Sequence, residues 1–182
     1  MKTILSTRIA LILFGIALSS ALAAQTDFRG TWSFDKAKSD LGQLGQGRQG
    51  RAGRAGRANI DLSNAEQKLV ITQSAEEIIV QRSFSMGAQE RPGQRQTYRL
   101  DGTETTIPAL AGRGEIKCTA TLKENALEIS GTQKLSTQRG EFNVNYEEKW
   151  TLSDDGKVLT MTTARTMGAG GNYTTKMVYN KQ

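Results

Sequence analysis

The stretch GEFNVNYEEKWTLSDDGKVLTMTTARTM, residues 140–167, decides the fold class, because its apolar side chains recur at every second position. The apolar residues of its first half that share one parity are Phe142, Val144, Tyr146, Trp150 and Leu152. Asp155-Gly156 then separates this run from a second one with Leu159, Met161, Thr163 and Met167 on one face. A period of two predicts half-buried strands, and an Asp-Gly pair supplies the positive φ of a tight hairpin turn. The stretch therefore predicts an antiparallel β-hairpin.

The same alternation extends outward in both directions. It occurs in residues 77–84, 115–122, 126–131 and 172–181. Asp101-Gly102 predicts a second tight hairpin, between TYRL and TETTI, and only residues 62–69 favour a short helical turn. Short strands joined by short turns predict an all-β protein, an antiparallel up-and-down meander. A meander of about 8–10 strands avoids exposed edges by closing into a barrel.

The N-terminus has the features of an export signal. Lys2 and Arg8 precede an apolar run over residues 9–18, and Ala21-Leu22-Ala23 is an A-x-A cleavage site. The run is shorter than the about 20 residues that a membrane-spanning helix needs. We therefore predict a signal peptide over residues 1–23, cleaved after Ala23, and a periplasmic or secreted bacterial protein without a transmembrane segment in its mature chain.

The mature chain, residues 24–182, has the length of a single domain. Cys118 is its one cysteine, so no intrachain disulfide forms, and we expect the thiol to be buried. The net charge of +6 falls to +4 without Lys2 and Arg8, and the four arginines of residues 42–58 account for the remainder. The body of the domain is thus neutral, which argues against a folded nucleic-acid-binding face.

Several motifs resemble those of a known group. Gly30-Thr31-Trp32 resembles the Gly-x-Trp signature that begins the first strand of lipocalin-like barrels. The later motifs are residues 38–40 (KSD), 98–102 (YRLDG), 150–160 (WTLSDDGKVLT) and 178–181 (VYNK). Together they are similar to uncharacterised exported bacterial lipocalin-like proteins of the calycin type. The resemblance implies a barrel fold and no particular reaction.

The resemblance also implies a structural barrel end. In lipocalins the signature tryptophan packs across the closed end, often against an arginine from a late strand. Gly30 and Trp32 would hold these places here. Arg165 shares the parity of Leu159 and Met161, so it is the expected partner of Trp32.

The sequence argues against an enzyme. Histidine is absent, which removes Ser-His-Asp and Cys-His arrangements and the commonest metal ligand. Neighbouring carboxylates such as Glu147 and Glu148 point to opposite faces of a strand and cannot converge on one substrate. We predict no catalytic residues, no metal and no cofactor.

A binding function fits such a barrel better. A barrel of eight strands is wide enough to be filled by side chains or to hold one small ligand, and the sequence leaves both outcomes open. The predicted interior residues are Phe142, Val144, Tyr146, Glu148, Met161, Met177 and Tyr179. Glu148 could anchor a polar ligand group inside the barrel. Burying an unpaired carboxylate is costly, however, so a position of Glu148 at the solvent-exposed rim of the barrel is favoured. The first hypothesis is therefore non-enzymatic binding of a small apolar molecule.

A Gly/Arg-rich segment at residues 42–58 carries the alternative hypothesis. Glycines and like charges predict an extended flexible loop. It is a tolerated insertion, or its arginines attract an anionic envelope surface such as lipid headgroups. Those arginines are Arg48, Arg51, Arg54 and Arg57. In this alternative the protein is an envelope-associated interaction module with a filled barrel.

Overall fold

The computed structural model describes residues 26–42, 66–86, 89–109, 114–137, 140–166 and 171–182. The predicted signal peptide and nearly all of the Gly/Arg-rich segment lie outside them. The strands are β1 (Gly30–Phe34), β2 (Glu66–Gln73), β3 (Glu77–Met86), β4 (Gln89–Arg99), β5 (Thr105–Pro108), β6 (Glu115–Lys123), β7 (Ala126–Thr137), β8 (Gly140–Leu152), β9 (Val158–Thr166) and β10 (Asn172–Lys181). A short 3-10 helix, η1 (Lys36–Lys38), follows β1.

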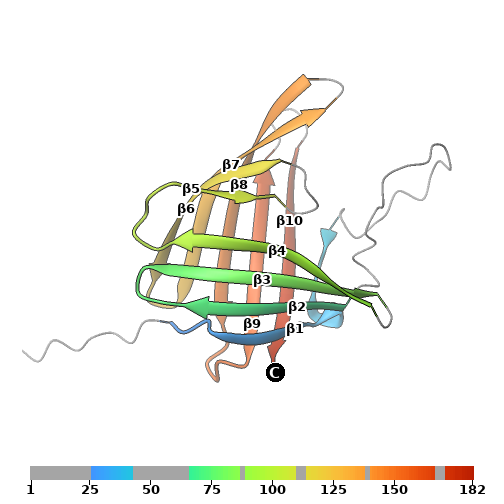
Figure 1. Ribbon diagram of the computed structural model, residues 1–182, viewed down its shortest axis with the longest axis vertical. Helices are drawn as coiled ribbons and strands as arrows, with labels where there is room; N and C mark the ends of the chain where they lie inside the picture. The colour runs from blue at the N-terminus through green and yellow to red at the C-terminus, as the bar shows by residue number, and fades with distance from the viewer. Residues whose placement is uncertain (1–25, 43–65, 87–88, 110–113, 138–139, 167–170) are drawn as a thin grey trace, which may run out of the picture.

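The ten strands form one antiparallel sheet that curls into a nearly closed barrel (Figure 1). Their order in the sheet is β4-β3-β2-β1-β10-β9-β8-β7-β6-β5. Strands that pair in the sheet therefore follow one another along the chain, except for the pair β1 and β10. There the first and last strands pair, with Trp32 opposite Lys181. The all-β meander predicted from the alternating pattern is confirmed.

The hairpin at Asp155-Gly156 is confirmed as well. β8 and β9 pair antiparallel through Leu152 and Leu159, and Gly156 has a φ of +67°. The amide of Val158 donates to the Ser153 hydroxyl at 2.9 Å, which closes the turn.

The tight hairpin predicted at Asp101-Gly102 is wrong. Gly102 does have a positive φ of +77°, but β4 and β5 stand at opposite ends of the strand order. Asp101 instead forms a β-bridge with Thr121 of β6. Its carboxylate accepts hydrogen bonds from the side chains of Arg99 and Thr103. The chain therefore turns without starting a β4–β5 ladder. We call this break in the wall the β4–β5 seam.

The helical turn predicted over residues 62–69 is wrong for the part that the structure describes. Glu66 begins β2, in which Gln67, Leu69 and Ile71 are buried and alternate with exposed residues. Pairing with β3 on one side and β1 on the other outweighs the weak local preference for helix.

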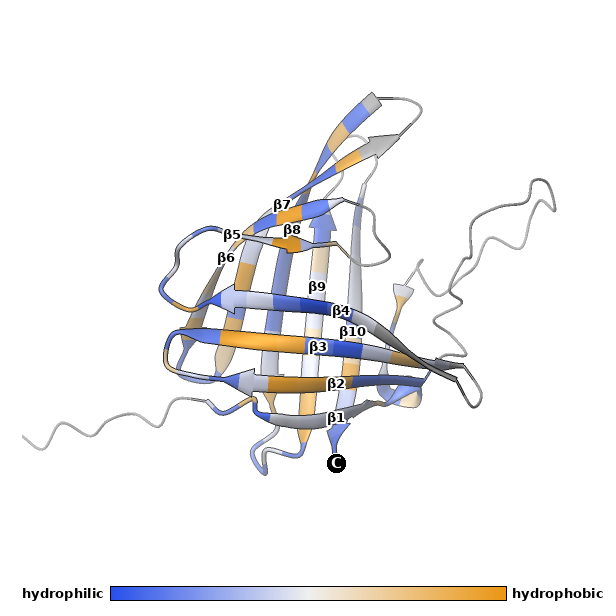
Figure 2. Cartoon of the chain, viewed as in Figure 1, coloured by the Kyte–Doolittle hydropathy of each residue, from blue (hydrophilic) through white to orange (hydrophobic). Residues whose placement is uncertain are grey.

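The core fills the inside of the barrel. Cys118 is buried there as a free thiol, as the sequence predicted. Within β3 an apolar run, residues 78–80, is followed directly by the polar Gln81 and Arg82 (Figure 2). Within the described residues, no helix is long and apolar enough to cross a membrane.

Candidate ligand-binding site

One end of the barrel is closed by an aromatic floor. The Trp150 ring meets Phe28 edge-on at a centroid distance of 6.0 Å and Tyr98 at 5.7 Å. Trp32 is fully buried and its indole donates to the Phe28 carbonyl at 3.0 Å. Phe28 reaches this position because its amide donates to the Gln73 side chain at 2.9 Å. The residues just before β1 thus seal this end.

The expected packing of Arg165 on Trp32 is wrong. The Lys181 ammonium lies 5.2 Å from the centre of the Trp32 ring, since Lys181 stands opposite Trp32 in the β1–β10 register. Gly30 leaves room for it, because a Cβ there would lie 2.9 Å from Lys181 Cε. Arg165 stands opposite Tyr146 instead, and its guanidinium lies 5.4 Å from that ring centre.

Above the floor lies a buried carboxylate with three hydrogen-bond donors. Glu148 is only 5% exposed. Its Oε1 accepts from the Trp150 indole at 2.5 Å, and its Oε2 accepts from the Thr163 hydroxyl at 2.8 Å and from the Tyr146 hydroxyl. We call these four residues the Glu148 cluster. The sequence favoured the wet rim for Glu148, and the donors from its own strand and from β9 are why it lies inside instead.

The opposite wall carries a second buried group around Arg82, which is 3% exposed. Arg82 Nε donates to Gln96 Oε1 at 3.3 Å, and the Tyr98 hydroxyl donates to the same oxygen at 3.3 Å. The Tyr179 hydroxyl lies 3.5 Å from both Gln67 Oε1 and Met177 Sδ, and its one proton can be donated to either. Arg82 also lowers the pKa of Tyr98 and of Tyr179, against the effect of burial. We call Arg82, Gln96, Tyr98, Tyr179 and Gln67 the Arg82 cluster.

Burial and charge set the ionisation of both clusters. Burial, and then the charge of Glu148, raise the pKa of Tyr146 well above its usual range, and the same causes act on Tyr98. Burial also raises the pKa of Tyr179, while Arg82 opposes the shift. Burial alone would lower the pKa of Arg82, but Tyr179 and Glu148 raise it above the ordinary value. All three tyrosines are therefore neutral and Arg82 is charged at neutral pH.

Most residues predicted for the interior lie there. Val144, Tyr146, Glu148, Met161 and Tyr179 are buried, and Met177 packs partly buried against the core. Phe142 differs, because its side chain is 47% exposed. It lies on the β7–β8 hairpin, which projects beyond the rest of the barrel (Figure 1), so no opposite wall covers it.

The arginines Arg48, Arg51, Arg54 and Arg57 lie outside the described residues.

The sequence reasoning missed the Arg82 cluster. The signal was present in EIIVQRSF, where Arg82 shares the parity of Ile78, Val80 and Phe84. A charged residue at a core parity is the feature that singled out Glu148, and it applies equally to Arg82.

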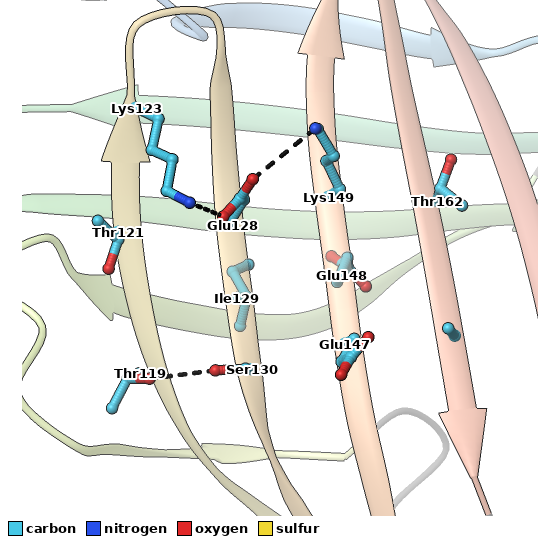
Figure 3. Close-up of a pocket in the computed structure, with 11 residues that line it drawn as sticks. Thr119, Thr121, Lys123, Glu128, Ile129, Ser130, Glu147, Glu148, Lys149 and Thr162 are labelled. Atoms are coloured by element: carbon cyan, nitrogen blue, oxygen red, sulfur yellow. Dashed lines mark hydrogen bonds and ion pairs between the residues drawn. The ribbon is translucent and has the colours of Figure 1, made fainter.

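A separate hollow of about 500 Å³ lies on the outer face of β6–β9 (Figure 3). Its hydroxyl and charged side chains alternate with buried ones, and Glu128 lies between Lys123 at 2.5 Å and Lys149 at 3.7 Å. These contacts lower the pKa of Glu128, first through the hydrogen bond from Lys123. Exposed ion pairs of this kind are ordinary on a solvated sheet face. The hollow lies on the outer face of the same wall whose inner face carries the Glu148 cluster.

The nearly closed meander, in which the first and last strands pair and β4 and β5 form the two edges, is a calycin-like β-barrel. Solved structures with similar folds include the REP1-NXSQ fatty acid transporter, at a TM-score of 0.53 and 13% identity over 86% of this chain and 96% of that one. The Schistosoma mansoni fatty acid binding protein in complex with arachidonic acid is similar at a TM-score of 0.51 and 15% identity, over 85% and 96% of the two chains. These likenesses show the fold. The sequence matches no protein-family model and no curated protein.

Proposed function

We propose that the protein is a non-enzymatic carrier that binds a small apolar molecule inside its barrel. The observation that carries this proposal is the division of the interior into an aromatic floor and a buried polar layer, with a charged arginine in that layer. Apolar walls with a few placed polar groups are typical of small-molecule sites. A barrel that only filled itself would be expected to avoid the cost of burying Arg82. The similar solved structures, whose names state that they transport or bind fatty acids, support the same function.

A ligand would have to move side chains that meet across the interior. Tyr98 of β4 touches Trp150 of β8 there, with ring centres 5.7 Å apart. The β4–β5 seam makes such movement least costly. Gln96 Nε2 donates across it to the Pro108 carbonyl at 3.1 Å. The neighbouring pairs are joined by backbone ladders, which a shift of register between Gln81 and Ser83 interrupts in β3–β4. Opening at the seam would give a ligand access without breaking a ladder.

The test is saturable binding of the neutral fluorescent probe N-phenyl-1-naphthylamine to the folded protein. We expect Met161→Trp, which fills the interior, to weaken probe binding at least tenfold. The matched control is Val70→Trp, because Val70 is an apolar residue exposed on the outer side of β2, and this variant should bind as before. Circular dichroism and the urea midpoint show whether each variant is folded. Absence of saturable binding by folded wild-type protein would refute the proposal.

Native mass spectrometry of protein purified from its own cells complements this test. A bound mass of a few hundred daltons that is lost on denaturation would establish the ligand directly.

A further inference from the structure

The described part of the barrel leaves strand edges unpaired in more than one place. β4 and β5 are the two edges of the sheet. The projecting β7–β8 hairpin adds another edge, because β9 pairs with β8 only from Asn145 onward. Residues 140–144 of β8 therefore face no described strand on that side. An open strand edge is a template on which another chain can pair.

The two edges of the sheet are protected by proline. The chain has two prolines, and they are Pro92 on β4 and Pro108 on β5. Proline has no N–H to donate to a ladder, and the exposed Arg95 adds a charge to the edge strand β4. Both strands are therefore poor templates. Residues 140–144, GEFNV, contain no proline and keep every N–H.

The same hairpin carries an uncovered apolar pair beside its open edge. Leu135 of β7 lies opposite Phe142 of β8, and the Phe142 side chain is 47% exposed. On the other face of the hairpin Lys134 and Glu141 form an ion pair of 2.7 Å, so their charges are balanced within one hairpin. A two-stranded hairpin gains little stability by itself in water. A partner that extends its sheet and covers Phe142 would stabilise it.

We propose that this partner is a second copy of the chain. Residues 140–144 of β8 pair antiparallel with the same residues of the second copy, and Phe142 lies opposite Phe142 of that copy on a two-fold axis. Such an interface uses one patch twice, as in most symmetric dimers. The dimer does not depend on a ligand in the barrel.

The sequence of this edge fits self-pairing in that register. With Phe142 on the axis, Glu141 lies opposite Asn143 of the second copy, so no like charges face each other across the new ladder. On the other face, Leu135 and Phe142 of one copy continue into Phe142 and Leu135 of the other. The result is an unbroken apolar row across four strands, with two aromatic rings at its centre. Aromatic pairs of this kind stabilise neighbouring strands.

Sedimentation equilibrium of the purified protein, in the form in which the cell accumulates it, tests the dimer. Stable interfaces use about 20–30 residues a side, far more than residues 140–144 supply, so we expect a reversible dimer with a dissociation constant on the order of 10–100 µM. Phe142→Lys sets two positive charges opposite each other and should raise that constant at least about tenfold. Phe142→Glu should do the same. An equimolar mixture of these two variants should dimerise about as well as wild type, because opposite charges then face each other across the axis.

Val70→Lys is the matched control, because Val70 is also an exposed apolar strand residue, at 41%, but lies on β2. It should keep the wild-type dissociation constant. Circular dichroism and the urea midpoint show that each variant is folded.

Three results would overturn the inference: a wild-type protein that stays monomeric to about 500 µM, a dimer that survives Phe142→Lys, or a mixture that associates no better than either variant alone. Monomeric wild-type protein that binds vesicles of phosphatidylcholine and phosphatidylglycerol, and loses this binding in Phe142→Glu, would make a lipid surface the partner and refute the dimer.

Discussion

The Glu148 cluster and the Arg82 cluster are both buried polar groups in one barrel, but they differ in how completely their hydrogen bonds are made. The Glu148 carboxylate has three donors from its own strand and from β9. The Arg82 cluster, spread over β2, β3, β4 and β10, ends in one donor, Gln67 Nε2, that has no acceptor among the described residues. A buried polar network whose members are bonded to one another makes the fold more rigid and specific. A buried network that ends in a free donor carries the cost of that unmade bond.

The strongest test of this contrast is the stability of Glu148→Gln. The substitution keeps the shape but replaces one acceptor oxygen with an NH₂ group that faces another donor. We expect the free energy of unfolding to fall by about 2–4 kcal/mol, because hydrogen bonds to a charged group contribute about 1.5–3 kcal/mol each. Urea unfolding measures it. Glu147→Gln is the control, since Glu147 is exposed on the other face of β8, and it should change stability by no more than about 0.5 kcal/mol.

An intermediate effect is expected at alkaline pH. Burial, and secondarily the charge of Glu148, raise the pKa of Cys118 from 9.0 to about 11. A pKa raised in the folded state gives stability that is complete below the unfolded value and is lost as pH rises toward the folded value. The contribution of Cys118 to the free energy of unfolding should therefore begin to fall near pH 9 and lose about 2 kcal/mol by pH 11, after allowance for solvent screening.

Cys118→Ala separates the thiol from the tyrosines in this pH titration. Its decline should begin only near pH 10, where tyrosines of the unfolded chain ionise while Tyr98, Tyr146 and Tyr179 remain neutral in the fold. An identical curve for wild-type protein and Cys118→Ala would mean that the thiol is not closed off from water beside the Glu148 cluster.

The smallest effect on stability should come from Gln67→Leu. The change removes one long bond to Tyr179 but also removes a buried donor without a partner, and the two terms oppose each other. We expect the free energy of unfolding to stay within about 1 kcal/mol of wild type. A loss above about 2 kcal/mol, measured by urea unfolding, would show that Gln67 is as structural as Glu148 and would erase the contrast between the clusters.

The sequence predicted the strands and the interior face of the C-terminal half well, because alternation is a local property. Tyr146, Met161 and Tyr179 were assigned to the inside from parity alone, and they are buried. Parity does not say how far a strand runs past its neighbours, so it could not show that Phe142 lies on a projecting hairpin. Nor could Asp101-Gly102 show whether its flanking strands pair, because that depends on where β4 and β6 lie in space.

By itself the sequence determined the all-β class, the Asp155-Gly156 hairpin and a buried Cys118, since each depends on residues close together along the chain. The tertiary structure decided which cation packs on Trp32, because Lys181 and Trp32 meet only when the first and last strands pair. It also decided that Glu148 is buried and satisfied while Gln67 is buried and is not. That difference depends on which donors and acceptors the opposite walls bring together, and no local pattern records it.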